Sequence, residues 1–156
     1  MSVITEDMRR EILSLFPRYP QERAALLPAL HVVQRERGWI PPEAMAEVAA
    51  LLGIRPVEVM EVVSFYTMFN RAPVGRHHIQ VCRNISCALR GARAITRHLS
   101  GKLKIPVGGT TPDGRFTLSE VECLGSCGTA PMLQCNDDYH EDLTVERVDE
   151  ILSRLP

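Results

Sequence analysis

The stretch APVGRHHIQVC, residues 72–82, marks the point at which the chain changes its pattern. Its first half holds turn-forming residues, and residues 77–82 alternate apolar and polar side chains as a half-buried β-strand does. Before residue 75 the apolar residues recur at helical spacing instead. We therefore expect an α/β protein in two parts: an N-terminal helical subdomain over residues 1–75 and an α/β domain with a small sheet over residues 76–156.

The N-terminal subdomain is expected to contain about four short helices. Proline and glycine mark several of their ends, because proline suits the first turn of a helix and glycine readily ends one. The first helix covers residues 8–16, the second starts close to Pro28 and stops at Gly38, the third covers residues 42–52, and the fourth starts at Pro56. Their apolar stripes are interpreted as core, with a docking surface for a partner as the alternative.

Beyond residue 75 the elements are expected in the order β-α-β-β-β-α. The second strand, FTLSEVEC over residues 116–123, is irregular, and we expect it to break near Ser119. PMLQCND and DYHEDL predict a hairpin with residues 136–138 at its tip, and Thr144 is expected to cap the last helix. The helix after the first strand is expected to present an apolar face made of Leu89, Ala92, Ile95 and Leu99.

The composition is that of an ordinary globular protein, with 45% apolar residues, 24% charged residues and a net charge of -1. No stretch gathers the basic residues of a nucleic-acid footprint. The acidic N-terminus lacks the features of a signal peptide, and no apolar run is long enough to cross a membrane. We therefore expect a cytosolic protein. A reducing compartment and an odd count of 5 cysteines both argue against structural disulfides.

Four of the cysteines fall into two pairs, Cys82 with Cys87 and Cys123 with Cys127. Each pair begins at the end of a predicted strand and runs into a loop. Neighbouring strands in a small sheet would bring the two loops together, so the sequence predicts four convergent thiolates. The fifth thiol, Cys135, lies within a predicted strand and is interpreted as a small buried hydrophobe.

Three chemistries use paired cysteines in this way. A dithiol redox enzyme uses C-x-x-C, and neither pair has that spacing. Structural zinc takes four thiolates, and the spacings here border on its range. A [2Fe–2S] cluster needs two thiolates at each iron, and the glycine-rich CLGSCG loop leaves backbone N–H groups free to point at anionic sulfur. Iron–sulfur is favoured on spacing, with zinc and unligated thiols as the alternatives.

The segments around these cysteines resemble a known family, the thioredoxin-like [2Fe–2S] ferredoxin subunit of the respiratory NADH:quinone oxidoreductase (complex I). The similar stretches cover nearly the whole chain: RERGWIPPEAM, GIRPVEVMEVVSFYTMF, PVGRHHIQVC, TTPDGRF, VECLGSCGTAPM and NDD. The resemblance implies a thioredoxin-like domain with a small mixed sheet over residues 76–156. It also implies one [2Fe–2S] cluster with four ligands, one pair at each iron: Cys82, Cys87, Cys123 and Cys127.

The same resemblance implies a partner, a flavoprotein subunit that binds FMN and NADH and exchanges single electrons with the cluster. The chain would belong to the peripheral arm of complex I in a bacterial cytoplasm, on the inner membrane but without spanning it. No substrate turnover is expected from this chain alone.

Closely similar subunits occur in NAD-linked formate dehydrogenases and bidirectional hydrogenases, which remain alternative parent complexes. A zinc-bound structural adaptor and a thiol oxidoreductase are the rivals from other functional classes. Candidate contacts with the flavoprotein are aromatic, with core packing as the alternative use: Trp39, Phe65, Tyr66 and Phe69.

Overall fold

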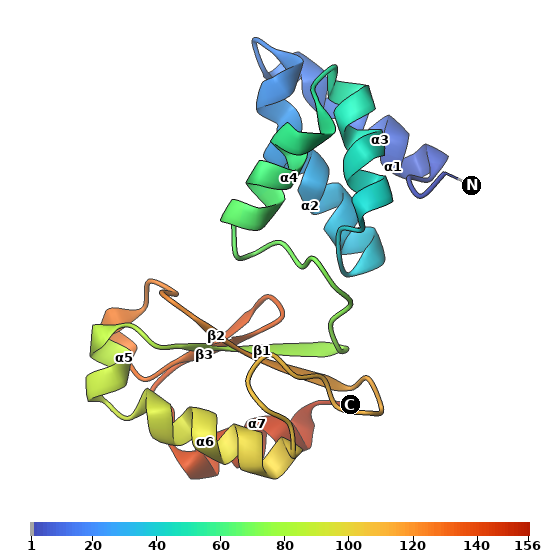
Figure 1. The fold of residues 1–156 in the computed structure, drawn as a ribbon. Helices are drawn as coiled ribbons and strands as arrows, with labels where there is room; N and C mark the ends of the chain where they lie inside the picture. The colour runs from blue at the N-terminus through green and yellow to red at the C-terminus, as the bar shows by residue number, and fades with distance from the viewer. Residues whose placement is uncertain (1) are drawn as a thin grey trace. The chain divides into compact units, whose positions relative to one another are not determined.

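The computed structural model describes residues 2–156 and divides the chain into two compact units. The first unit ends at Pro73, and the second runs from Val74 to Pro156 (Figure 1). The first unit is helical and the second combines helices with a four-stranded sheet. The mixed α/β class expected from the sequence is therefore confirmed. Each unit encloses its own apolar core.

Four α-helices make up most of the first unit: α1 (Glu6–Leu15), α2 (Leu26–Arg37), α3 (Pro42–Leu52) and α4 (Pro56–Phe65). Short 3-10 turns at Phe16–Arg18 and Glu22–Ala25 lie between α1 and α2. Pro42 and Pro56 begin their helices, and Gly38 and Gly53 follow theirs in the left-handed conformation. That conformation is easy for glycine because it has no Cβ, so these helix ends were readable from the sequence.

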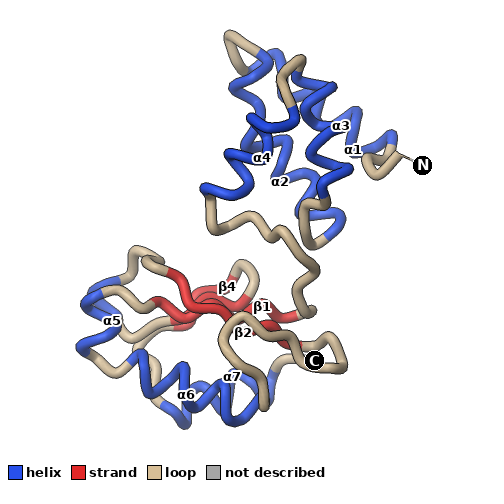
Figure 2. The backbone as a smooth tube through the Cα atoms, viewed as in Figure 1, coloured by secondary structure: helices blue, strands red, loops and turns tan. Residues whose placement is uncertain are grey.

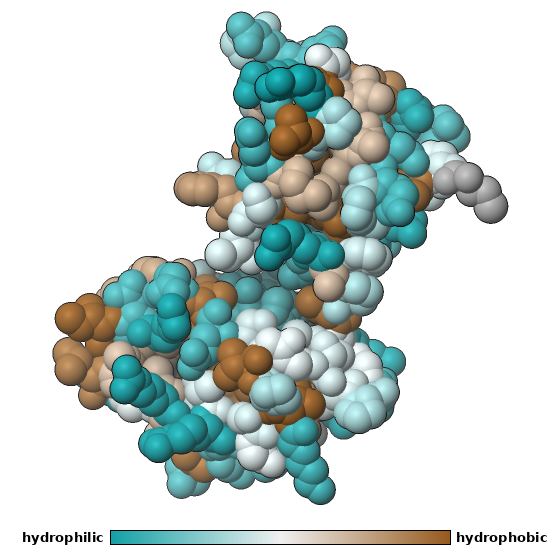
Figure 3. Space-filling view, in the orientation of Figure 1, coloured by the Kyte–Doolittle hydropathy of each residue, from teal (hydrophilic) through white to brown (hydrophobic). Residues whose placement is uncertain are grey.

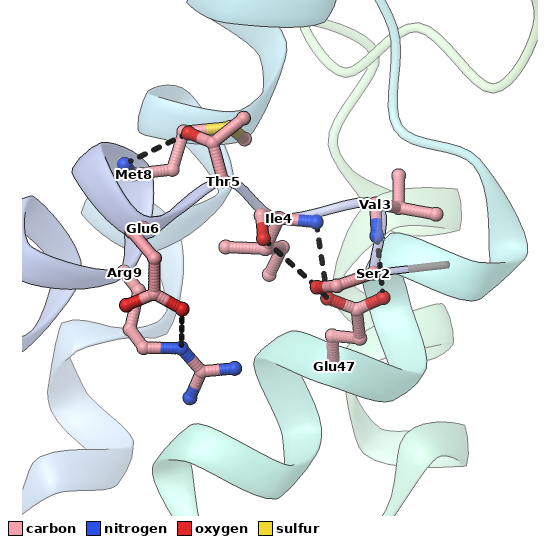
Figure 4. A network of polar contacts seen from close by, with 8 residues as sticks. All are labelled: Ser2, Val3, Ile4, Thr5, Glu6, Met8, Arg9 and Glu47. Carbon is pink, nitrogen blue, oxygen red and sulfur yellow. Dashed lines mark hydrogen bonds and ion pairs between the residues drawn. The ribbon is translucent and has the colours of Figure 1, made fainter.

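The apolar stripes of the four helices meet in one core, which includes Ile12, Leu30, Val48 and Val59. Phe69 is also buried there, at 5% exposure, so of the four aromatic candidates it is not free to contact a partner. A carboxylate on α3 binds the N-terminal segment, and its hydrogen bonds to residues 2–4 are drawn in Figure 4.

The second unit is built on a mixed sheet with the strand order β2-β1-β3-β4. Its strands are β1 (His77–Cys82), β2 (Phe116–Val121), β3 (Leu133–Cys135) and β4 (Asp138–His140). β1 runs parallel to β2 and antiparallel to β3, and β3 and β4 form the expected hairpin (Figure 2). β2 continues without a break through Ser119, contrary to expectation, because each of its residues stays in register with β1.

The second unit has three α-helices: α5 (Ile85–Leu89), α6 (Ala92–Leu103) and α7 (Val145–Arg154). α6 and α7 lie along one face of the sheet in Figure 1. Thr144 caps α7 by accepting a hydrogen bond from the N–H of Arg147 at 3.2 Å, as expected. The prediction for Leu89 was wrong: the residue belongs to the separate helix α5 and is 82% exposed, because Gly91 breaks the helical path before α6 begins.

Among residues 2–156, no helix combines the length and apolar character needed to cross a membrane. The most exposed large apolar side chains are Phe65 at the end of α4, and Ile85 and Leu89 on α5. Figure 3 shows apolar surface over both elements.

Candidate metal centre

Two loops leave the sheet side by side, one after β1 and one after β2. Because these strands are parallel and Cys82 is opposite Val121, both loops leave the sheet at the C-terminal ends of the two strands. The N–H of Arg83 donates to the carbonyl of Val121 at 3.0 Å. The guanidinium of Arg83 also pairs with the carboxylate of Glu122, with Nε and Oε1 2.9 Å apart. Direct bonds therefore join the residue after Cys82 to the residue before Cys123.

The first thiol pair is buried. Cys82 ends β1 and is 3% exposed, and its N–H donates to the carbonyl of Met132 at 3.2 Å. Cys87 lies on α5 and is 2% exposed. The short helix is started by Asn84, whose side-chain oxygen accepts from the N–H of Ile85 at 2.7 Å. Burial, followed by the neighbouring thiol of Cys82, raises the pKa of Cys87, so without a bound cation this thiol is neutral.

The second thiol pair is exposed and lies in a tight loop. Cys123 follows β2, and Cys127 begins a 3-10 turn that ends at Thr129. Gly125 between them has φ of +81°, in the left-handed region where glycine is favoured. Cys127 is close enough to Cys87 to contribute to the raised pKa of Cys87.

The sequence predicted four convergent thiols, and the structure brings the two loops together at one edge of the sheet. Cys82 and Cys127 both act on the pKa of Cys87, while Cys123 lies at the base of the second loop, next to the Glu122 that pairs with Arg83. Within residues 2–156, no group of three or more His, Cys, Asp or Glu side chains is arranged to hold a single ion. The thiols stand as a buried pair and an exposed pair.

A polar network that the sequence did not predict holds the loop between Cys123 and Cys127. The hydroxyl of Tyr139 on β4 donates to the carbonyl of Leu124 at 2.9 Å. Two residues further on, one carboxylate oxygen of Glu141 accepts from the hydroxyl of Ser126 and from that of Thr129, the latter at 2.7 Å. These bonds from Ser126 and Thr129 lower the pKa of Glu141, so it is ionised at neutral pH. The only signal of this network in the sequence is the i, i+2 spacing of Tyr139 and Glu141, which puts both side chains on one side of an extended strand.

The fifth cysteine and the histidines lie in other surroundings. Cys135 ends β3 at 3% exposure within the apolar core of the second unit, which agrees with its interpretation as a small buried hydrophobe. Burial, and then the charge of Asp138, raises the pKa of this thiol. Three of the five histidines bind oxygen atoms: His98 contacts Asp149 at 2.6 Å, His78 contacts Ser119 at 2.9 Å, and His77 contacts the carbonyl of Pro156 at 2.9 Å.

Comparison with known proteins gives one family and several close relatives. The family model described as thioredoxin-like [2Fe-2S] ferredoxin matches residues 12–156. A protein of Rhizobium meliloti (strain 1021) that is named as an NADH-quinone oxidoreductase subunit is 49% identical over 145 residues, which cover 93% of this chain and 86% of that protein. NADH-quinone oxidoreductase subunit 2 of Thermus thermophilus is 45% identical over 153 residues, covering 96% of this chain and 84% of the relative.

Among solved structures, an NAD+-reducing [NiFe]-hydrogenase in the air-oxidized state has a similar fold, with a TM-score of 0.72 and 27% sequence identity. The match covers 83% of this chain but 22% of the hydrogenase chain. The likeness therefore extends to about a fifth of that longer polypeptide.

Proposed function

Because this chain belongs to the thioredoxin-like [2Fe–2S] ferredoxin family, we propose that it is the electron-transfer subunit of an NADH:quinone oxidoreductase (complex I). In this proposal the chain binds one [2Fe–2S] cluster through Cys82, Cys87, Cys123 and Cys127. It exchanges single electrons with the FMN of a partner flavoprotein that binds NADH, as part of a peripheral arm bound to the inner membrane.

The observation that carries the proposal is the bonding between the two cysteine loops. Arg83 binds both Val121 and Glu122, so the chain segments that bear the two thiol pairs are joined where they leave the sheet. The proposed donor set is four sulfur atoms, in two pairs, which is the set that a [2Fe–2S] cluster uses. Soft thiolate ligands favour iron–sulfur clusters over hard cations such as Mg²⁺ or Ca²⁺.

When bound, such a cluster adds and releases one electron at a time, whereas NADH gives up two electrons as a hydride, so a flavin has to stand between them. The residues of this chain supply binding and surroundings. Cys82 and Cys87 close one side of the site to water, and Cys123 and Cys127 leave the other side open to a partner. No side chain of this chain is required to transfer a proton in this function.

A second parent complex is favoured by one observation, the likeness to the NAD+-reducing [NiFe]-hydrogenase. In that case the chain would carry out the same electron exchange in a hydrogenase or a formate dehydrogenase. The relatives named as NADH-quinone oxidoreductase subunits are more similar, at 49% and 45% identity against 27%. We therefore place complex I first.

The test is analysis of the purified chain and of the proteins that copurify with it. We expect about two irons and two sulfides per chain, and an electron paramagnetic resonance signal after reduction. One zinc in a colourless protein would refute the electron-transfer proposal and favour a structural adaptor. Copurifying complex I subunits would support the first parent complex, and hydrogenase or formate dehydrogenase subunits would support the second.

A further inference from the structure

The β4 hairpin contacts the Cys123–Cys127 loop at two places. Tyr139 lies in the middle of β4 and binds the carbonyl of Leu124, one residue after the first thiol. Glu141 lies just beyond β4 and binds Ser126, one residue before the second thiol. The loop is therefore held next to each of its cysteines by side chains from a different part of the sequence.

Glu141 is the stronger of the two contacts. The same oxygen, Oε1, accepts from the hydroxyls of Ser126 and Thr129, and these hydroxyls lie 2.8 Å from each other. The backbone adds support, because the N–H of Asp142 donates to the carbonyl of Thr129 at 2.8 Å. Hydrogen bonds to an ionised acceptor are shorter and stronger than neutral ones, and these three hydroxyl and carboxyl groups are partly shielded from water.

The first thiol pair, Cys82 and Cys87, is held in place without contacts of this kind. Cys82 is fixed by a strand and Cys87 by a helix, and both are buried in the apolar core. Cys123 and Cys127 are exposed and are joined by a segment that contains a glycine in the left-handed conformation. An exposed loop of this kind has many accessible shapes, and ordering it costs conformational entropy.

We propose that Tyr139 and Glu141 are positioning residues that hold the Cys123–Cys127 loop in the shape that binds the cluster. This inference rests on the proposed function, since it concerns the same four thiols. Residues that orient metal ligands tune both the affinity for the metal and its electronic properties. Both residues thus act on the cluster through the loop, without touching it.

The experiment compares variants of the cluster-loaded chain during challenge with an iron chelator. Glu141→Ala removes the acceptor, and we expect the visible absorption of the cluster to decay about tenfold faster than in the wild type. Glu141→Gln keeps an oxygen in the place of Oε1 and should decay within about twofold of the wild type. Tyr139→Phe removes one neutral hydrogen bond, for which we expect about threefold faster decay.

Two controls make the same chemical change elsewhere. Glu150→Ala removes a carboxylate on α7 that pairs with Arg154, and Tyr19→Phe removes a hydroxyl in the first unit. Neither should change the decay. A positioning role also predicts altered g values and reduction potential in Glu141→Ala, with both restored in Glu141→Gln. A loss of general stability alone would leave these properties of the bound cluster unchanged.

A double-mutant cycle tests the route of the effect. Because Glu141 acts through the loop hydroxyls, Ser126→Ala combined with Glu141→Ala should decay no faster than Glu141→Ala alone. If Glu141→Ala does not fold, Tyr139→Phe and Ser126→Ala remain as milder tests with the same prediction of faster decay. Wild-type decay and spectra in all of these variants would overturn the inference while leaving the proposed function intact. A wild-type chain that holds no iron and sulfide would overturn both.

Discussion

The attachment of the N-terminal segment to α3 depends on one carboxylate, that of Glu47 (Figure 4). Its two oxygens accept from the N–H of Val3 at 2.7 Å, from the N–H of Ile4 at 3.0 Å and from the hydroxyl of Ser2 at 2.6 Å. Glu47→Ala removes all three acceptor contacts at once. Ile4, which is 2% exposed, then loses the contact that keeps its backbone in place over the core.

The expected loss follows from these contacts. We take about 1 kcal/mol for each of the three bonds, since the carboxylate is only partly buried. Part of this loss is offset because the freed N–H groups can bind water. We therefore expect Glu47→Ala to lower the free energy of unfolding of the first unit by about 2 kcal/mol.

The effect also depends on pH with a defined sign. Burial acts to raise the pKa of Glu47, but the hydrogen bonds from Ser2, Val3 and Ile4 outweigh it and lower this pKa below its ordinary value of 4.5. A carboxylate whose pKa is lower in the folded state stabilises the fold above its unfolded pKa. The difference between wild type and Glu47→Ala should therefore be full at pH 7 and shrink as the pH falls below about 4.5.

Urea unfolding followed by tryptophan fluorescence measures this unit directly, because the single tryptophan, Trp39, lies within it. With a slope of about 1 kcal/mol/M for a unit of this size, the midpoint should fall by about 2 M. Glu61→Ala on α4 is the matched control and should change the free energy of unfolding by less than about 0.5 kcal/mol. Equal midpoints for Glu47→Ala and Glu61→Ala at pH 7 would refute the reasoning.

Three further predictions concern the second unit. Cys123→Ser should abolish or strongly alter the iron content and resonance spectrum, because an alkoxide is a harder ligand than a thiolate; a normal spectrum would contradict the ligand assignment. Cys135→Val should keep the iron content and cost about 1 kcal/mol or less in thermal unfolding, and loss of iron would show that the wrong four thiols were chosen. In Gly75→Ala the new Cβ would lie 2.8 Å from the carbonyl carbon of Phe116, so we expect a loss of about 1–3 kcal/mol by the same measurement. Gly101→Ala in α6, where nothing lies within 4 Å, should instead stabilise by about 0.5–1 kcal/mol, and equal effects at both glycines would argue against the close approach.

The sequence predicted those elements whose signals are local. β1 was expected over the residues that form it, because its alternation and the preceding turn residues are contiguous. The ends of α2 and α3 were marked by Gly38 and Gly53, since each helix stops where the chain enters the left-handed conformation. Thr144 was expected to start α7 because threonine accepts a hydrogen bond from the first turn of a helix.

Features that depend on tertiary contacts were missed. α5 is a five-residue helix, too short to show a periodic pattern, and its Leu89 was assigned to the following helix. The contact between Glu141 and Ser126 joins residues fifteen positions apart, and neither segment by itself predicts it. The division into a buried and an exposed thiol pair was also invisible, because burial is decided by which elements pack over each loop.

The side-by-side exit of the two cysteine loops depends on the connection between β1 and β2 rather than on the loops themselves. Parallel strands require a crossover, and here α5 and α6 supply it between Cys82 and Phe116. If residues 83–115 had formed a simple hairpin, β2 would run antiparallel to β1. Cys123 would then emerge at the other end of β1, about 20 Å from Cys82 for a strand of six residues. The apolar face of α6, with Ile95 and Leu99 buried in the core of the second unit, therefore helps to place the two cysteine loops side by side, although neither residue belongs to either loop.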